Sequence, residues 1–541
     1  MQSLERWCKK VRFMTHFSRR QETLEMFSRR SAQCASSSEF FVDDPNSEPL
    51  ILPEGAPRDF RDSAQRIWSS LARRSNVVAV LLVVFYIAWF IHLNLQSYYT
   101  YGEPPFDLAI FDQGLWLISH FHVPFVTVMG RNLFGDHTSF VLYLFAPFYR
   151  LFPEPQGLLV LQTFLVAGPA VPIYLLARKY IKSTIIATTL VAVYLLNPII
   201  EQGNLDQFHP EAFQVLFISL AIYAAIERRK ALLVVMVVLS LMVKEDAATL
   251  VVPLGVWVAA RRDRRLGLSI ITGSVLWAMV ANWLIIPSIL GAPSIYAGRL
   301  PFGGFSGLLG TIFHRPGQFF SYLGSQGRPF YLWQLGSTVG FAFLFAPEIA
   351  AIGVLLVAEN IISNDPYMHQ ILYQYSMALV PILVLGTLFA IAQQSTVWRR
   401  NTLTIAALCA AIWTCALWGY APFSSNLVFT NSVSPSSIQG LNYLEKQLPP
   451  NAVVAAWYPL VSHIDQRTQI YVWPTPFSAS NWGLAGQTGE RLPVSSQVQY
   501  LLLPVPLTSS EDPQVFSQIS KHYELVHSRG GFGLYEKTDS P

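Results

Sequence analysis

Two aspartates follow the first long apolar segment, at the point where a new helix is expected to begin. Pro104 and Pro105 come soon after the apolar residues 76–96, and Asp107 and Asp112 come next. Proline and an acidic residue both favour the first turn of a helix, so Asp107 could simply cap this helix. A carboxylate held at a membrane surface could also act as a general base that takes a proton from a hydroxyl group. Asp112 lies five residues later, about 140° around the helix, so either aspartate could be that base.

Histidines accompany acidic residues in two other polar segments. Asp136 directly precedes His137, and Asp206, His209 and Glu211 lie within six positions of one another. Carboxylate and imidazole groups are common ligands of divalent metals, so a divalent metal could bind here, although no cofactor is certain and the metal is unknown. The same groups could hydrogen-bond a sugar or a phosphate, and an ordinary polar loop is the alternative. We expect these five residues to bind substrate.

A charged group interrupts the otherwise apolar stretch 231–260. It contains Lys244 and Glu245. Charges between apolar runs are costly unless they pair with each other or line a wet cavity. Lys244 could therefore face a lipid-linked phosphate, whereas a tight turn with a local ion pair is the simpler alternative. His369 and Tyr373, in a later polar segment, are expected to add to the same substrate-binding site.

The composition requires a membrane to surround these segments. Hydrophobic residues make up 52% of the 541 residues and charged residues only 13%, about half the charged share of a soluble domain. Apolar runs near 20 residues match a hydrocarbon core of about 30 Å, and several such runs predict a helix bundle. The net charge of +4 is too small to indicate a nucleic-acid partner. The four cysteines lack metal-ligand spacing and do not suggest a disulfide scaffold.

The apolar runs predict a multi-spanning, all-α membrane protein with about 11 transmembrane helices. We place these spans at residues 76–96, 157–177, 183–200, 211–226, 230–243, 247–260, 266–287, 331–346, 348–362, 373–392 and 402–420.

Basic residues favour one orientation of these spans. If the first span runs outward, the basic clusters all fall on the cytoplasmic side, as the positive-inside rule requires. These clusters are Arg73-Arg74, Arg178-Lys179 with Lys182, Arg228-Arg229-Lys230, Arg261-Arg262 with Arg264-Arg265, and Arg399-Arg400. The short apolar segment 140–152 would reverse this pattern if it crossed the membrane, so we interpret it as an interfacial or re-entrant helix.

The polarity of the chain divides it into three parts. Residues 1–72 are polar and are expected to form a largely disordered cytoplasmic tail. Residues 73–420 form the transmembrane domain. Residues 421–541 alternate short β-type runs with helical ones, which predicts a small extracytoplasmic α/β domain. The chain is therefore expected to be a multi-pass protein of the cell membrane, with a cytoplasmic N-terminus.

The polar motifs together resemble those of a known group. FDLAIFDQ at 106–113, GDH at 135–137, FHPE at 208–211 and KED at 244–246 resemble an uncharacterised bacterial family of multi-spanning membrane proteins built like the GT-C glycosyltransferases. The resemblance covers roughly residues 76–535.

This resemblance implies a function. GT-C enzymes transfer a sugar from a polyprenyl-phosphate carrier on the outer face of the membrane, and an acidic residue of their first outer loop acts as the base or orients the acceptor. Asp107 and Asp112 are the corresponding candidates here. Thr138 and Ser139 follow the GDH motif where protein O-mannosyltransferases have two prolines, and the FHPE motif matches no catalytic element of characterised members. The expected partners are a polyprenyl-phosphate-linked sugar donor, an unknown acceptor and membrane lipid.

Two other classes of function remain open. A polytopic transporter or lipid flippase would usually show inverted repeats and helices broken near the middle of the membrane. The charges here cluster at the outer ends of the spans, and no repeat is visible, which favours the enzyme. A non-catalytic membrane scaffold, whose outer domain binds a partner, is the second alternative.

The orientation can be tested by cysteine labelling. Cysteines placed at positions 205 and 460 should react with an impermeant thiol reagent applied from outside, whereas those at 180 and 263 should not, because basic loops stay in the cytoplasm. Labelling from outside at position 263 would contradict the orientation.

Overall fold

The computed structural model describes residues 58–102, 106–426, 433–484 and 488–538. Most of the tail expected over residues 1–72, and the Pro104-Pro105 pair, therefore lie outside the described residues. The chain divides into two compact units, Met1–Ser70 and Leu71–Pro541. Helix α3 comprises Arg58–Tyr99. All that follows concerns the second unit.

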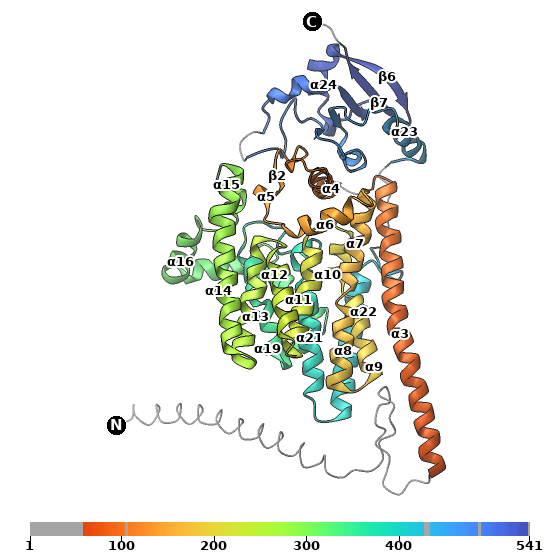
Figure 1. Cartoon of the computed structure of the whole chain (residues 1–541), viewed down its shortest axis with the longest axis vertical. Helices are drawn as coiled ribbons and strands as arrows, with labels where there is room; N and C mark the ends of the chain where they lie inside the picture. The colour runs from red at the N-terminus through yellow and green to blue at the C-terminus, as the bar shows by residue number, and fades with distance from the viewer. Residues whose placement is uncertain (1–57, 103–105, 427–432, 485–487, 539–541) are drawn as a thin grey trace. The chain divides into compact units, whose positions relative to one another are not determined.

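Long apolar helices form the body of this unit (Figure 1). Among the described residues, five helices are long and apolar enough to cross a membrane, and a sixth span is possible if one pair bent by 44° counts as a single span. The five are Arg74–Tyr99 in α3, Pro155–Ile181 (α7, Pro155–Ala167, and α8, Ala170–Ile181), Arg264–Leu290 (α14, Arg264–Val280, to α15, Ile286–Leu290), Gln374–Ala392 (η8, Gln374–Ser376, and α21, Leu379–Ala392) and α22 (Val397–Trp418). The bent pair is α9 (Thr184–Leu195) and α10 (Pro198–Leu205).

The other expected spans are helical but short. They correspond to α11 (Glu211–Ile226), α12 (Lys230–Leu241) and α13 (Ala248–Arg261). The 16 residues of α11 reach about 24 Å, which is less than the hydrocarbon thickness. The multi-spanning helical bundle is confirmed, whereas the count of 11 full-length spans exceeds what helix length supports.

Two expected spans, 331–346 and 348–362, are broken into short pieces. The chain forms α18 (Arg328–Ser337), η6 (Ala342–Phe345), α19 (Pro347–Ala350), η7 (Ala351–Gly353) and α20 (Val354–Ile362). Gly340 and Phe341 adopt left-handed backbone angles, with φ of 60° and 54°, which a continuous right-handed helix cannot accommodate. Hydropathy alone does not report this break.

The segment predicted to be interfacial forms α6 (Val141–Tyr149), which has nine residues. A helix of this length reaches about 14 Å, so it is too short to cross the hydrocarbon core. It packs against α4 (Phe106–Ser119) and leaves Tyr143, Leu144 and Phe148 exposed. This length agrees with the interpretation of residues 140–152 as a non-spanning helix.

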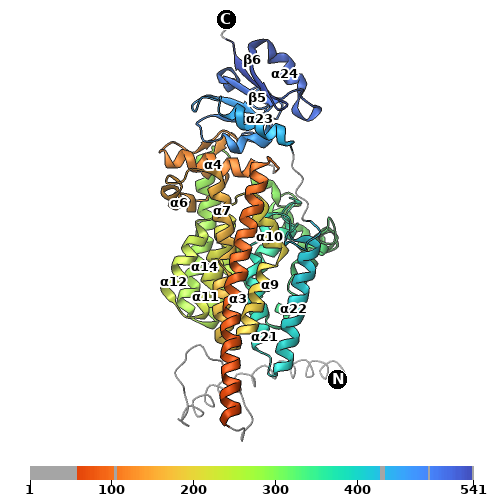
Figure 2. The same cartoon turned by 90° about the vertical axis from the view of Figure 1, so that its right-hand side faces the viewer.

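A five-stranded sheet forms the C-terminal α/β domain that the sequence predicted (Figure 2). Its strand order is β4-β3-β5-β7-β6. The strands β3 (Val454–Ala456), β4 (Ile470–Val472) and β5 (Tyr500–Pro504) are parallel, and β6 (Tyr523–Arg529) and β7 (Phe532–Lys537) complete the sheet in antiparallel fashion. Helices α23 (Pro435–Glu445) and α24 (Pro513–Ile519) flank it. The side of the membrane on which it lies stays a prediction.

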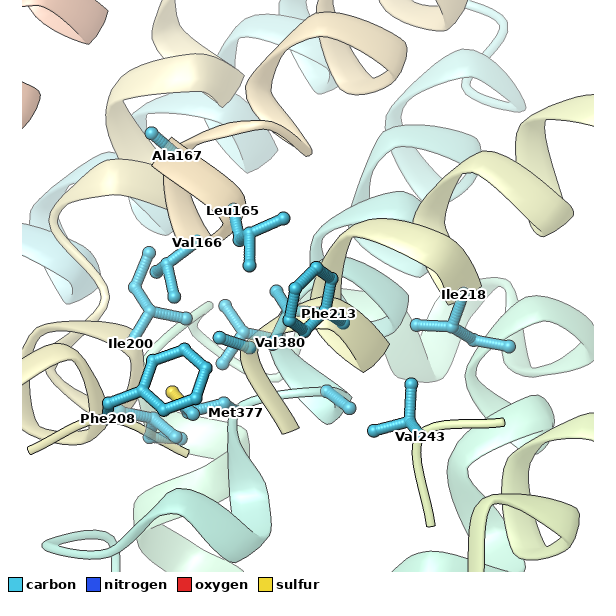
Figure 3. Packing of buried hydrophobic residues seen from close by; sticks show 14 of the residues in the cluster. Leu165, Val166, Ala167, Ile200, Phe208, Phe213, Ile218, Val243, Met377 and Val380 are labelled. Atoms are coloured by element: carbon cyan, nitrogen blue, oxygen red, sulfur yellow. The ribbon is translucent and has the colours of Figure 1, made fainter. Parts of the chain in front are cut away.

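The core of the bundle lies where α7, α10, α11 and α21 meet (Figure 3). Side chains such as Val166, Phe208, Phe213 and Met377 are buried there. Gly203 of α10 allows the close approach, because a Cβ at this position would lie 2.4 Å from the sulfur of Met377. This contact holds the last turn of α10 against the end of η8.

A hydrogen-bonded joint attaches the C-terminal domain to the first loop of the bundle. The Thr127 hydroxyl donates to the carbonyl of Ile470 at 2.7 Å and accepts from its N–H at 2.8 Å. The Trp482 indole donates to the Thr127 carbonyl at 3.0 Å, and the N–H of Gly483 donates to the carbonyl of Met129 at 2.8 Å. Gly130, with φ of 69°, lies under the Trp482 ring.

We expect Gly130→Ala to weaken this joint. The added Cβ would lie 2.2 Å from the Trp482 ring, in a backbone conformation that alanine disfavours, so unfolding should become easier by about 2 kcal/mol. Thermal unfolding and limited proteolysis of the C-terminal domain would measure this change.

Gly291→Ala is the matched control, because Gly291 also has a positive φ, of 72°, but a Cβ added there would have no atom within 4 Å. Its loss of stability should reflect only the strain of placing alanine in this backbone conformation. Equal stability loss in both variants would mean that the Trp482 contact contributes nothing.

Candidate functional site

The predicted site residues lie at the ends of helices. Asp107 lies in the first turn of α4, and Asp136 ends the short helix α5 (Leu133–Asp136). The segment that joins α10 to α11 carries Asp206 and His209, and Glu211 begins α11. Lys244 directly precedes η3 (Glu245–Ala247), which lies between α12 and α13 and carries Glu245 and Asp246. We call this group the polar cluster; it consists of Asp107, Asp136, His137, Asp206, His209, Glu211, Lys244, Glu245 and Asp246.

Asp107 and His209 form an ion pair at the edge of the polar cluster. The Nε2 atom of His209 lies 3.5 Å from Oδ2 of Asp107, and the Asp107 side chain is 44% exposed whereas that of His209 is buried. Burial lowers the pKa of His209, but Asp107 and the neighbouring Asp206 outweigh this effect and raise it to about 9. The imidazole is therefore charged at neutral pH and holds one oxygen of a carboxylate that solvent still reaches.

Asp206 and Gln207 support this pair from the segment after α10. Burial, together with Asp107, raises the pKa of Asp206 to about 7. The side-chain carbonyl of Gln207 accepts from the N–H of Leu108 at 2.9 Å, and Gln207 itself has a left-handed φ of 59°. This bond fixes the first turn of α4, and with it Asp107, beside His209.

Lys244 is buried and neutralised by two carboxylates. Its Nζ atom lies 2.9 Å from Oε1 of Glu211 and 3.3 Å from Oδ2 of Asp246. Burial acts to lower the pKa of Lys244, but the adjacent carboxylates Asp246 and Glu211 raise it well above its usual value. The lysine therefore keeps its charge and pairs with Glu211 of α11 as well as with the nearby Asp246.

A hydrogen bond between His137 and Glu245 joins the GDH and KED motifs. Nδ1 of His137 lies 2.7 Å from Oε1 of Glu245, and the Thr138 N–H donates to the other oxygen at 3.1 Å. Burial acts to raise the pKa of Glu245, but His137 lowers it to about 2. Asp136 accepts from the guanidinium of Arg131 at 2.8 Å and from the hydroxyl of Tyr296 at 2.9 Å.

Residues outside the predicted set surround His137 and Lys244. The Tyr296 ring stacks on His137 with centroids 4.6 Å apart. The Arg299 guanidinium lies 4.1 Å from the centre of the Tyr296 ring and pairs with Asp365 at 3.1 Å. Tyr375 lies between the two cations, 5.6 Å from Lys244 and 5.7 Å from Arg299. Only Arg299 carried a sequence signal, as a cation in a polar loop.

A pocket opens beside Lys244. It encloses about 410 Å³, including the solvent at its mouth, and its polar lining residues are Glu211, Gln214, Lys244, Asp246, Thr249, Asn360, Gln374 and Tyr375. This lining places part of the polar cluster on the wall of a pocket. Among the described residues, no three His, Cys, Asp or Glu side chains are grouped in a way that could hold a metal ion.

Asp112 does not join the polar cluster. It is fully buried, and its two oxygens accept from the Tyr149 hydroxyl at 2.7 Å and from the Gln466 amide at 3.2 Å. Burial raises its pKa to about 6, and burial together with Asp112 raises that of Asp465 well above its usual value. Asp112 thus lies in the contact between α4, α6 and the C-terminal domain.

His369 and Tyr373 are placed differently from each other. His369 is buried, and burial together with Arg328 lowers its pKa. Tyr373 packs against Tyr367 with centroids 4.9 Å apart, and it lies close enough to Asp206 for that carboxylate to contribute to its raised pKa, after burial and Tyr367. Tyr373 therefore borders the polar cluster, whereas His369 lies beside Arg328.

Comparisons with known proteins add a family and a distant structural likeness. Among curated proteins none matches the chain. Two solved structures of ArnT from Cupriavidus metallidurans are similar. The form bound to undecaprenyl phosphate shares 11% sequence identity with this chain, and the apo form shares 10%. Each match covers 84% of this chain and 98% of the ArnT chain, with a TM-score of 0.45.

The family comparison agrees with the multi-spanning membrane family expected from the motifs. The model described as "Predicted membrane protein (DUF2079)" matches residues 103–539, which include every residue of the polar cluster and the whole sheet of the C-terminal domain. Because this match covers far more than half of the chain, the protein belongs to the DUF2079 family of predicted membrane proteins.

Proposed function

We propose that this protein is a membrane glycosyltransferase that moves a sugar from a polyprenyl-phosphate carrier to an acceptor hydroxyl. The observation that carries the proposal is the solvent-accessible Asp107 carboxylate, held by the charged, buried His209 at the end of a helical membrane bundle. A carrier anchored by an isoprenoid tail presents its sugar near the membrane surface, and we expect the start of α4, which follows the candidate span Arg74–Tyr99, to lie at that depth.

Asp107 is the proposed general base. An acceptor hydroxyl becomes a strong nucleophile only when its proton is drawn off, and a positioned carboxylate is suited to this task. His209 contacts Oδ2 of Asp107, so the other oxygen is the one that would take the proton. The hydroxyl oxygen would then bond to the anomeric carbon as the bond to the carrier phosphate breaks, in one displacement that inverts this carbon.

The C-terminal domain supports this assignment by forming a wall next to Asp107. Tyr458 begins η9 (Tyr458–His463), which packs on α4. Its ring lies 6.5 Å from that of Phe106, and burial together with Asp107 raises the pKa of Tyr458 to about 12. The Tyr458 hydroxyl therefore stays protonated and can donate a hydrogen bond to a polar acceptor molecule.

Arg299 is the proposed ligand of the carrier phosphate. Lys244, which we expected in this role, is only 5% exposed and already contacts two carboxylates, so its proposed task is to hold Glu211 and Asp246 in place. The Arg299 side chain is 23% exposed and pairs with Asp365 alone among the described carboxylates. Its planar guanidinium can bind phosphate through two hydrogen bonds and stabilise the departing negative charge.

The remaining predicted residues have proposed supporting roles. Asp206 and Tyr373 border Asp107 and could bind sugar hydroxyls, and the pair of His137 and Glu245 holds the first loop against η3. Asp112 is proposed to fasten the C-terminal domain. The transporter and scaffold alternatives require no accessible base, so the experiments below distinguish them from the enzyme.

Asp107→Asn should abolish sugar transfer. Asparagine keeps the shape of the side chain but cannot take the proton, so the rate for each folded molecule should fall about 10²–10⁴-fold. The melting temperature should fall as well, because the ion pair with His209 is lost. A transfer assay on membranes, run beside thermal unfolding, would measure both. Unchanged transfer would contradict the proposed mechanism and favour the transporter.

Asp112→Asn is the matched control. The asparagine would place an amide N–H₂ group where Asp112 now accepts a hydrogen bond from either Tyr149 or Gln466. The loss of this hydrogen bond should cost about 1–3 kcal/mol of stability. The rate for each folded molecule should change far less than in Asp107→Asn. The reverse pattern would identify Asp112 as the base.

The Asp107–His209 pair also predicts a pH dependence. Because the folded-state pKa of His209 is raised to about 9 from an unfolded value near 6.5, its contribution to stability should be complete below about pH 6.5 and lost as the pH rises through about 9. His209→Gln should remove this part of the pH dependence of the melting temperature. Identical pH profiles for both proteins would mean that the imidazole is neutral.

A further inference from the structure

A second pocket lies at the opposite end of the helices, between two hairpins of the bundle. The α11–α12 hairpin turns at residues 227–229, and the α13–α14 hairpin turns at 262–263. The space between them encloses about 580 Å³, including the solvent at its mouth, and its lining residues are Ala224, Ala225, Arg228, Lys230, Leu233, Val258, Arg262, Asp263 and Leu266. None of these belongs to the polar cluster.

The side chains that line this pocket carry three positive charges and one negative charge. The carboxylate in the pocket lining is that of Asp263. It pairs with Lys230 at 2.6 Å and accepts hydrogen bonds from two N–H groups at the start of α14. Two arginines at the mouth have no carboxylate partner among the described residues. They are Arg228 and Arg262.

The two arginines are held in place by the fold. Arg228 has a left-handed φ of 57°, which turns the chain sharply after α11. Arg262 donates from Nε to the carbonyl of Ala225 on the facing hairpin at 3.1 Å, and its guanidinium lies 4.9 Å from the centre of the Trp257 ring. Its Nη1 also donates to the carbonyl of Arg261 at 3.4 Å. These contacts fix Arg262 across the gap, and its Nη2 remains to bind an anion.

The surroundings of the pocket are apolar, as a lipid requires. Its inner wall consists of alanine, leucine and valine side chains. Next to it, α12 exposes Val234, Val235 and Val238, and α14 exposes Leu268 and Leu276. Such surfaces on membrane helices face acyl chains, so a ligand with a phosphate and attached hydrocarbon would satisfy both the arginines and the helix faces.

We propose that this pocket binds the head group of an anionic phospholipid. Arg228 and Arg262 contact its phosphate, Lys230 lies at the rim, and the acyl chains run along α12 and α14. Basic pockets between membrane helices bind anionic head groups on the cytoplasmic side, which is the side that the arginine clusters predict for these two turns. The site is independent of the proposed sugar transfer.

The test uses the purified full chain in an uncharged detergent. Native mass spectrometry counts retained lipids while phosphatidylglycerol is added, and thermal unfolding measures the accompanying stabilisation. Each lost charge should weaken binding about fivefold, so Arg228→Gln/Arg262→Gln should weaken it about 25-fold. The double variant Arg228→Lys/Arg262→Lys keeps both charges, so its lipid binding should weaken far less.

Three controls make the proposal falsifiable. Arg399→Gln/Arg400→Gln removes two charges from another loop and should bind as the wild type does; an equal loss there would mean unspecific attraction. If inorganic phosphate stabilises the protein as much as the lipid does, the ligand is a free anion and the proposed lipid site is wrong. If the double variant does not fold, Arg228→Gln alone decides, since this side chain is exposed, and unchanged binding would overturn the proposal.

Discussion

The pairing of Lys244 with Glu211 and Asp246 is the interaction on which the arrangement of the polar cluster depends. A buried charge without a partner costs several kcal/mol, so an ammonium 5% exposed must keep its carboxylates. Glu211 begins α11 and Asp246 lies before α13, and the pairing therefore holds these two helix starts together. The adjacent Glu245 extends the same network to His137 and the first loop.

This network divides the site into a rigid and an accessible part. The cations and carboxylates around Lys244 satisfy one another, whereas Asp107, 44% exposed, pairs only with His209 among the described residues. The C-terminal domain closes the accessible part, because η9 brings Tyr458 beside Asp107 while the Thr127 hydroxyl anchors the sheet. In the proposed site, a polar molecule would reach Asp107 without exposing the buried ion pairs.

Much of the fold follows from apolar segment length, and the departures have identifiable causes. The runs at 76–96 and 402–420 became long helices because only a helix satisfies its own backbone in hydrocarbon. The span predicted over residues 331–346 failed as a continuous helix because Gly340 and Phe341 adopt left-handed angles. Hydropathy measures burial in lipid but not backbone angles, so it could not reveal this break or the shortness of α11.

The sequence by itself determined the membrane class, the C-terminal α/β domain and the polar motifs at helix ends, because composition and periodicity depend only on nearby residues. It could not separate Asp107 from Asp112, which share a helix and a residue type. Asp112 is buried by Tyr149 and by Gln466, which lies 354 positions away, whereas Asp107 faces solvent beside His209. Tertiary structure alone decided this difference, because the exposure and hydrogen bonding of a carboxylate depend on which distant segments pack against it.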